Sequence, residues 1–353
     1  MPKYIKNRSN IEVFKPISGI FNERQLSEIL YSLEGKSEIP RKYGYFGTGV
    51  GKWSNKSING MEQLLAQSEN KKFNMFIAQY ELIRKTIDLV LGAVQNHVKI
   101  NIVDIGCGNG FPIFPILKYL QDRKQLNKYI ALDIVPQMCD LAINNLKGHH
   151  GLKKLKTLKS VHDIEDGHFA DILIKERDES TINLFCFFSN TLGNMIDRHR
   201  ALANIRDSMT VGDLLWIGNT LFSNASAQES FYNSLEINSD QYKYYHGDAL
   251  SFFESFQMNW WEYGYVSVRQ SDYNGLLKYY FVVTKPFILE IPKIKKQNAV
   301  ELEFEEGREI VFVRLKNYTE TDLLNELKEA GFKTKLLNVS DDYRAALVLV
   351  SVN

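Results

Sequence analysis

Residues 103–110 read Val-Asp-Ile-Gly-Cys-Gly-Asn-Gly, and this stretch decides the fold. A largely apolar segment, 99–105, leads into the glycines, and a segment with helical apolar spacing, 112–120, follows them. Glycines at such a strand-to-helix turn accept positive φ and let a ligand approach the backbone closely. Pro112 suits the first turn of a helix, where its missing donor costs nothing. The stretch predicts a strand–turn–helix unit that binds a ligand; a tight turn without a ligand is the alternative.

A carboxylate follows the next apolar segment, residues 129–134. Asp133 stands 23 residues after Gly110, where an acidic side chain accepts hydrogen bonds from ribose hydroxyls. NAD, FAD and S-adenosylmethionine all offer that ribose. Dinucleotide binders use Gly-x-Gly-x-x-Gly to seat a pyrophosphate, but here the third glycine comes one residue early and Asp104 precedes the first. The sequence therefore favours S-adenosylmethionine; for Asp133, a solvated loop carboxylate is the alternative.

The same strand–helix rhythm continues along the chain and then breaks. Further strands are predicted at 155–161, 181–188 and 213–218, with helices at 71–96, 137–146 and 198–208. This rhythm implies right-handed crossovers and a parallel sheet. Aromatic-rich alternating segments predict antiparallel strands at 260–268, 277–284 and 310–315, before a helix at 320–330 and two closing strands at 332–337 and 345–352.

We therefore expect an α/β protein of two domains. A doubly wound, Rossmann-like domain takes residues 70–230 and 316–353, and binds the cofactor. A second, α+β domain takes residues 1–69 and an insertion after the fifth strand, 231–315, and serves as substrate or lid domain.

Composition narrows the class of protein. The 353 residues are 44% hydrophobic and 24% charged, as in ordinary globular proteins, and the net charge of +1 gives no general attraction to nucleic acid or acidic membrane. No apolar run approaches the ~18 residues of a membrane helix, and the N-terminus does not resemble a signal peptide. The three cysteines and the histidines lack disulfide or metal-site spacing, so we expect a cytoplasmic protein without a metal.

A further acidic segment falls where the third strand should end. Residues 161–166 read Val-His-Asp-Ile-Glu-Asp, and a carboxylate there can accept from an adenine amino group; a charged surface turn is the alternative. The residues expected to bind the cofactor follow the first four strands: Asp104, Gly106, Cys107, Gly108, Gly110, Asp133, Ile134, Asp163, Ile164 and Asn190.

Three stretches resemble a known family. Residues 103–110 together with Asp133 look like the class I methyltransferases. Residues 34–45, with Ile-Pro-Arg-Lys-Tyr-Gly-Tyr, are similar to the start of the histidine-specific methyltransferases. Residues 188–194, Phe-Ser-Asn-Thr-Leu-Gly-Asn, resemble that family's Gly-Ser-Thr-Ile-Gly-Asn segment. The family includes the ergothioneine-pathway histidine N-methyltransferases and the fungal ergot-alkaloid N-methyltransferases, and the patchy likeness runs from about residue 25 to the C-terminus.

The resemblance implies which residues contact the methyl acceptor. The family's asparagine that holds the amino-acid substrate corresponds to Asn194, and tyrosines that line its pocket correspond to Tyr43 and Tyr45. The position of Asn194 agrees, because ligands of open α/β sheets bind beyond the carboxyl ends of the strands, and its amide both donates and accepts. A turn or helix cap remains the alternative for Asn194, and packing between domains for the tyrosines.

One departure from the family concerns the acceptor. In the family, a late strand carries an acidic residue and a hydroxyl that grip the substrate imidazole. Counting back from residues 316–319 places these positions at Val313 and Leu315, which are apolar, with Arg314 between them facing the other way.

The predicted function is S-adenosylmethionine-dependent N-methylation of a small amine or amino-acid-derived molecule other than free histidine. The alternatives are an O-methyltransferase of an aromatic or polyketide-like molecule, and a catalytically silent S-adenosylmethionine-binding protein. A small-molecule acceptor is the expected partner, and the sequence leaves the oligomeric state open.

Overall fold

The structure is a computed structural model of the chain, which divides into two compact units. We call Trp53–Asn224 with Leu315–Asn353 the large unit, and Met1–Lys52 with Ala225–Arg314 the small unit. The structure describes residues 11–52, 75–92, 94, 98–148, 151–177, 180–221, 225–271, 275–292, 298–341 and 344–352.

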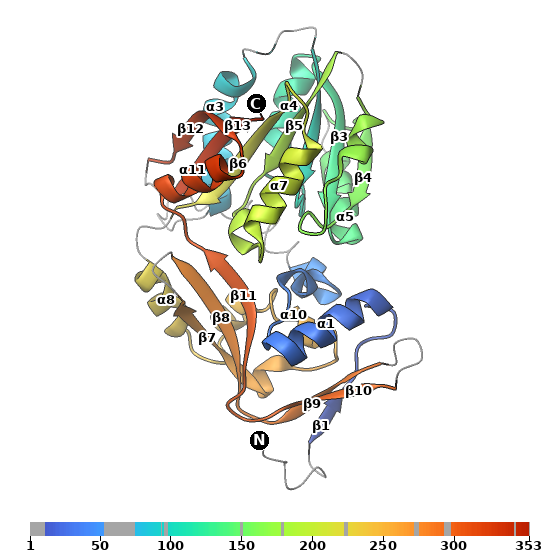
Figure 1. Cartoon of the computed structure of the whole chain (residues 1–353), viewed down its shortest axis with the longest axis vertical. Coiled ribbons are helices and arrows are strands. Elements are labelled where there is room, and N and C mark those ends of the chain that lie inside the picture. Colours follow the sequence, from blue (N-terminus) through green and yellow to red (C-terminus); the bar gives the residue numbers. More distant parts are fainter. Residues whose placement is uncertain are drawn as a thin grey trace. The chain divides into compact units, whose positions relative to one another are not determined.

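A seven-stranded sheet in the order β12-β13-β6-β5-β2-β3-β4 forms the centre of the large unit (Figure 1). Its strands are β2 (Lys99–Ile105), β3 (Leu126–Asp133), β4 (Thr157–Val161), β5 (Thr181–Phe187), β6 (Leu214–Thr220), β12 (Lys333–Val339) and β13 (Ala345–Ser351). β4, β3, β2, β5 and β6 run parallel, and β13 is antiparallel to both β6 and β12. The strand order reverses between β2 and β5, and ligands of open α/β sheets bind at such a switch point.

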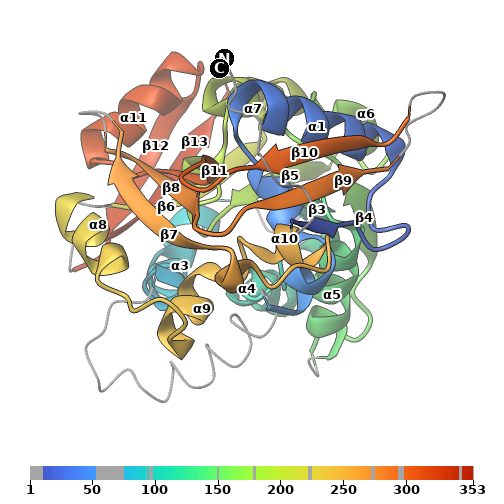
Figure 2. The ribbon, with the colours of Figure 1, turned by 90° about the horizontal axis from the view of Figure 1, so that it is seen from below.

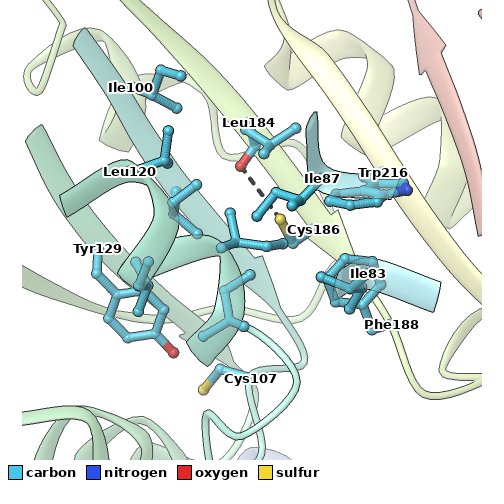
Figure 3. Close-up of a cluster of buried hydrophobic side chains, with 14 of the residues drawn as sticks. Ile83, Ile87, Ile100, Cys107, Leu120, Tyr129, Leu184, Cys186, Phe188 and Trp216 are labelled. Carbon is cyan, nitrogen blue, oxygen red and sulfur yellow. Dashed lines mark hydrogen bonds between the residues drawn. The ribbon is translucent and has the colours of Figure 1, made fainter. Parts of the chain in front are cut away.

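Helices cover both faces of this sheet, so the predicted doubly wound fold is confirmed. Helices α3 (Met75–Leu91), α4 (Phe114–Asp122) and α5 (Pro136–Gly148) contribute to the apolar core of one face. Helices α6 (Ala170–Ile174), α7 (Arg198–Ser208) and α11 (Glu320–Glu329) contribute to the core of the other. Figure 3 shows the first core, where Ile83 and Ile87 of α3 lie against Leu184 and Trp216 of the sheet. Strands buried on both faces need continuous apolar runs, which is why the sequence predicted them well.

The small unit contains two three-stranded sheets and several helices. One sheet has the order β1 (Glu12–Phe14), β9 (Phe287–Ile291), β10 (Val300–Phe304), and Figure 2 shows β9 between its two neighbours. The other has the order β11 (Glu309–Lys316), β8 (Leu276–Val283), β7 (Gly264–Gln270). Its helices are α1 (Glu23–Lys36), η2 (Arg41–Tyr45), α8 (Ala225–Asn233), α9 (Asp240–His246), α10 (Ser251–Glu254) and η4 (Trp260–Glu262).

The predicted strand at 260–268 is wrong at its start. Residues 260–262 form the short helix η4, in which the Tyr263 amide donates to the Trp260 carbonyl, and β7 begins only at Gly264. A Cβ at Gly264 would lie 2.3 Å from the Val282 carbonyl oxygen, so the strand pair requires glycine there. Of the helix predicted at 71–96, Met75–Leu91 is helical, and residues 71–74 and 95–96 lie outside the described residues.

Candidate active site

The glycine turn after β2 requires its glycines. Gly106, Gly108 and Gly110 have φ of 64°, 52° and 75°, in the left-handed region that favours glycine. A Cβ at Gly106 would lie 3.3 Å from Thr191 Cγ2, and one at Gly110 would lie 3.2 Å from backbone and side-chain atoms of Ala142. The turn thus packs against α5 and against the segment after β5 through bare backbone.

Asp133, the last residue of β3, lies against this turn. Its Oδ2 accepts from the Gly108 amide at 3.3 Å, and its Oδ1 accepts from the Val135 amide at 3.0 Å. Burial raises the pKa of this carboxyl to about 6, although the backbone amides lower it in part. The side chain is only half-buried, so lone pairs remain for a ligand, and it is ionised at neutral pH. Ile134 is the half-buried residue that follows it.

Asp104 and Cys107, at the start of the turn, are both buried. Asp104 is buried and accepts a hydrogen bond from the Tyr129 hydroxyl at 2.7 Å. Burial raises its pKa to about 7, the Tyr129 hydrogen bond opposes this, and the Asp133 charge adds to it. Cys107 is also buried, near Tyr129 in Figure 3, and burial raises the pKa of its thiol well above the usual value. Cys107 is therefore a packing residue and not a reactive thiol.

The segment after β4 joins the same edge of the sheet. The His162 amide donates to the Asp133 carbonyl at 3.0 Å, so this segment continues beside β3. Asp163 is half-buried and accepts from the Glu165 amide at 3.0 Å, which closes a local turn. Ile164 is buried, and its carbonyl accepts from Asn204 Nδ2 at 2.7 Å. The structure therefore brings the segments after β2, β3 and β4 to one edge.

The segment after β5 is held in a strained conformation. Ser189 and Asn190 are consecutive non-glycine residues with φ of 66° and 61°. The Ser189 amide donates to Gln79 Oε1 at 2.8 Å, and Asn190 Oδ1 accepts from the Thr220 amide at 3.1 Å. Residues in this region cost on the order of 1–3 kcal/mol each and persist where the surroundings fix them, typically at functional sites.

The sequence reasoning missed Gln79, which lies on α3 far from residue 189 in the chain. It is buried, and a Cβ at Gly218 would lie 2.8 Å from its Oε1, so Gly218 makes room for this side chain. A glutamine on the apolar side of a helix that otherwise packs against the sheet was the available signal.

Asn194 ends the short helix η3 (Leu192–Asn194) in the same segment. The backbone amide of Asn194 donates to the Thr191 carbonyl at 3.1 Å, and the residue is half-buried. A Cβ at the preceding Gly193 would lie 2.8 Å from Asn190 Nδ2. The strained pair and Asn194 therefore form one compact loop beyond the carboxyl end of β5.

Tyr43 and Tyr45 belong to η2 of the small unit. Tyr43 is buried, and its hydroxyl donates to Glu28 Oε2 at 2.7 Å. Tyr45 is half-buried, and the Arg41 guanidinium carbon lies 4.4 Å from the centre of its ring. Tyr43 thus packs inside its unit, and Tyr45 is the more available of the two.

The family model for histidine-specific, SAM-dependent methyltransferases matches residues 69–352. The chain belongs to this family. It is an S-adenosylmethionine-dependent methyltransferase, and both the predicted enzyme class and the predicted cofactor are confirmed.

Solved structures of methyltransferases are similar to it at low identity. A S-adenosylmethionine-dependent methyltransferase from Clostridium acetobutylicum ATCC 824 is 13% identical, covers 84% of this chain and 98% of its own, and has a TM-score of 0.43. The sugar N-methyltransferase KedS8 from Streptoalloteichus sp ATCC 53650 is 13% identical over 83% and 92%, with a TM-score of 0.36. The glycopeptide N-methyltransferase MtfA complexed with S-adenosyl-L-methionine is 11% identical over 78% and 94%, with a TM-score of 0.38. None of the curated proteins compared matches the chain.

Val313 and Leu315, the two apolar residues singled out in the sequence, lie on β11 of this methyltransferase. Phe312 is buried, with its ring 6.2 Å from that of Tyr279, and strand alternation directs Val313 and Leu315 to the other side. Arg314 forms a two-pronged pair with Glu38, through Nε–Oε1 at 2.7 Å and Nη2–Oε2 at 2.6 Å. The guanidinium of Arg314 is therefore paired with a carboxylate of the same unit.

The described residues hold neither a metal-ligand cluster nor a membrane-crossing helix. The described part of the methyltransferase contains no group of three or more His, Cys, Asp or Glu side chains suited to a metal ion. Within the same residues, no helix has the length and apolar character that crossing a membrane requires.

Proposed function

We propose that this methyltransferase transfers the methyl group to a nitrogen of a small amine or amino-acid-derived acceptor other than free histidine. Membership of a family that includes N-methyltransferases supports nitrogen as the atom that accepts the methyl group. The exclusion of histidine rests on the apolar pair Val313 and Leu315, which the register inferred from the family resemblance places where an imidazole would be gripped.

The described residues at the sheet edge fit the cofactor. Asp133 has lone pairs for ribose hydroxyls, and Asp163 has a carboxylate for the adenine amino group. We also assign the backbone of the Gly106–Gly110 turn to the cofactor, with Asp104 and Cys107 buried beside it. Ile134, Ile164 and Asn190 complete the proposed contact set. When bound, S-adenosylmethionine supplies a methyl group activated by its sulfonium.

The chain then needs to hold the acceptor nitrogen neutral and in line. We assign Asn194 to the amino end of the acceptor, and the η2 tyrosines Tyr45 and Tyr43 to the acceptor side group. Holding the reactants in the attack geometry and excluding water are sufficient for much of the rate, because the methyl donor is intrinsically reactive. An α-amine has a pKa of about 8, so a sizeable neutral fraction exists near neutral pH without a dedicated base.

Tyrosine provides the test of nitrogen against oxygen, because it carries an amine and a phenol in one molecule. The chain is incubated with S-adenosylmethionine and tyrosine or tyramine, and the methylated atom is assigned by NMR. Nitrogen transfer predicts a rate that rises with pH through the pKa of the amine, and up to three methyl groups on one atom. A single methyl group on the phenol oxygen would replace the proposal with an O-methyltransferase. Cofactor binding without turnover of any acceptor would indicate a silent binding protein.

A further inference from the structure

Arg41, the first residue of η2, has an incompletely paired guanidinium. Its side chain is 15% exposed, and Nη2 lies 3.5 Å from Oδ2 of Asp248, a long distance for an ion pair. Nε and Nη1 are buried and have no hydrogen-bond partner in the described structure. A buried donor left unpaired costs ~1–3 kcal/mol, and more for a charged group, so this arrangement implies a missing acceptor.

The surroundings fix the plane of this guanidinium. The Tyr45 ring covers one face at 4.4 Å. A Cβ at Gly44 would lie 3.0 Å from Nη1 and 2.8 Å from the Ala249 carbonyl oxygen, so glycine lets the guanidinium lie against the backbone. Hydrogen-bond donors of a guanidinium point outward in its plane. The unpaired donors Nε and Nη1 therefore lie at its edge, beside the Tyr45 ring.

Aromatic rings lie near the same group. Tyr279 is 5.4 Å from Tyr232 and 6.3 Å from His246, measured between ring centres. Burial is the main cause that raises the pKa of Tyr279, and the Arg41 guanidinium lowers it, which places the two groups within electrostatic reach. Arg41 therefore lies within electrostatic reach of a buried aromatic ring, Tyr279.

Two other arginines of the small unit, in contrast to Arg41, have their guanidinium groups fully paired with a carboxylate. Arg314 is gripped by both oxygens of Glu38, and Arg269 donates to both oxygens of Glu309 at 3.0 and 2.6 Å. Arg269 also lies over a tyrosine, Tyr280, at 4.9 Å, yet its side chain is 46% exposed. Arg41 shares the stacked ring but lacks the carboxylate fork.

We propose that Arg41 binds a carboxylate of the methyl acceptor, so that the preferred acceptors are amino acids or other carboxylate-bearing amines. This inference rests on the proposed function. A carboxylate matches the planar geometry of guanidinium donors, and charge-assisted bonds of this kind are roughly twice as strong as neutral ones. Asp248 holds the third nitrogen and orients the plane, and the Tyr45 ring supports the acceptor beside it.

The test compares amino acids with the amines that lack only the carboxylate. Calorimetry on the full chain, saturated with S-adenosylhomocysteine, measures the Kd of tyrosine, tryptophan and phenylalanine against tyramine, tryptamine and phenethylamine. For the wild type, at least one amino acid should bind more than about ten-fold tighter than its amine, the worth of one charged hydrogen bond. In Arg41→Gln that preference should vanish while amine binding changes little, and Arg41→Lys should restore part of it.

Arg269→Gln is the matched control, because it removes a stacked arginine whose partners are already in place. It should keep the preference of the wild type. A preference for the carboxylate that survives in folded Arg41→Gln overturns the inference, and so does equal binding of acids and amines by the wild type. Turnover with S-adenosylmethionine separates the role of Arg41 from the proposed function. If amines are methylated without any preference for a carboxylate, only the proposed role of Arg41 is refuted. If no probe binds or is methylated, both the inference and the proposed function fail.

Discussion

Replacing Asp133 by asparagine tests the cofactor site most sharply. The change keeps the shape of the side chain and the oxygen that accepts from the Val135 amide at 3.0 Å. It places an NH₂ group opposite the Gly108 amide, where Oδ2 now accepts at 3.3 Å, so two donors face each other. It also removes the charge that we propose receives the ribose hydroxyls.

The expected loss follows from these contacts. A hydrogen bond to a charged group contributes about 1.5–3 kcal/mol, and the amide can replace only one of the two ribose acceptors. One lost bond corresponds to roughly a 10- to 150-fold increase in the Kd for S-adenosylmethionine. Because burial raises the pKa of Asp133 to about 6, wild-type affinity should also fall as the pH drops through that value, and the variant should not show this dependence.

Isothermal titration calorimetry on both proteins measures the effect. Asp140→Asn is the control, since Asp140 lies on the neighbouring helix α5 but is 56% exposed and pairs with Lys159. The affinity of Asp140→Asn for S-adenosylmethionine should equal that of the wild type. Thermal unfolding should show that both variants are folded. Unchanged affinity in a folded Asp133→Asn protein would refute the assignment of this carboxylate to the ribose.

Three further outcomes are expected. Asn194→Ala should raise the KM of the acceptor by about ten-fold or more and leave the Kd of the cofactor nearly unchanged; the reverse pattern in kinetics and calorimetry would exchange the two roles. Asp104 has a folded-state pKa of about 7, raised from 3.8, so the folded state holds its proton and stability falls as pH rises through that window. Urea unfolding should show Asp104→Asn gaining up to about 4 kcal/mol on the wild type between about pH 4 and pH 7, and parallel curves would refute this. Gly110→Ala, at φ 75° and 3.2 Å from Ala142, should cost roughly 1–3 kcal/mol of stability, whereas Gly167→Ala, with no atom within 4 Å, should not; equal melting temperatures would contradict the packing argument.

The sheet and the glycine turn after β2 were predictable because their signals are local. Parallel strands are buried on both faces and appear as apolar runs, and the glycines of residues 106–110 need positive φ for reasons that the sequence itself displays. Asp133 was found from its place at the end of a strand, and the structure brings it to Gly108.

The rest depends on contacts between distant residues. Gln79 reaches Ser189, and Arg41 meets Asp248, through tertiary packing that no spacing rule describes. Ser189 and Asn190 adopt positive φ although neither is glycine, so the sequence gives no sign of this backbone strain. The surrounding structure imposes it. Strands β9 and β10 were missed because each is only five residues long, which gives too short a pattern to recognise.

The acceptor specificity of this methyltransferase is tested by a side-by-side measurement of kcat/KM with labelled S-adenosylmethionine. Histidine is compared with tyrosine, tryptophan, phenylalanine and their derivatives as acceptors. We predict N-methylated product from at least one of the others, with histidine poorer by about ten-fold or more, because an imidazole nitrogen left unpaired beside Val313 and Leu315 costs ~1–3 kcal/mol. Efficient trimethylation of histidine, in preference to every other acceptor, would contradict the account.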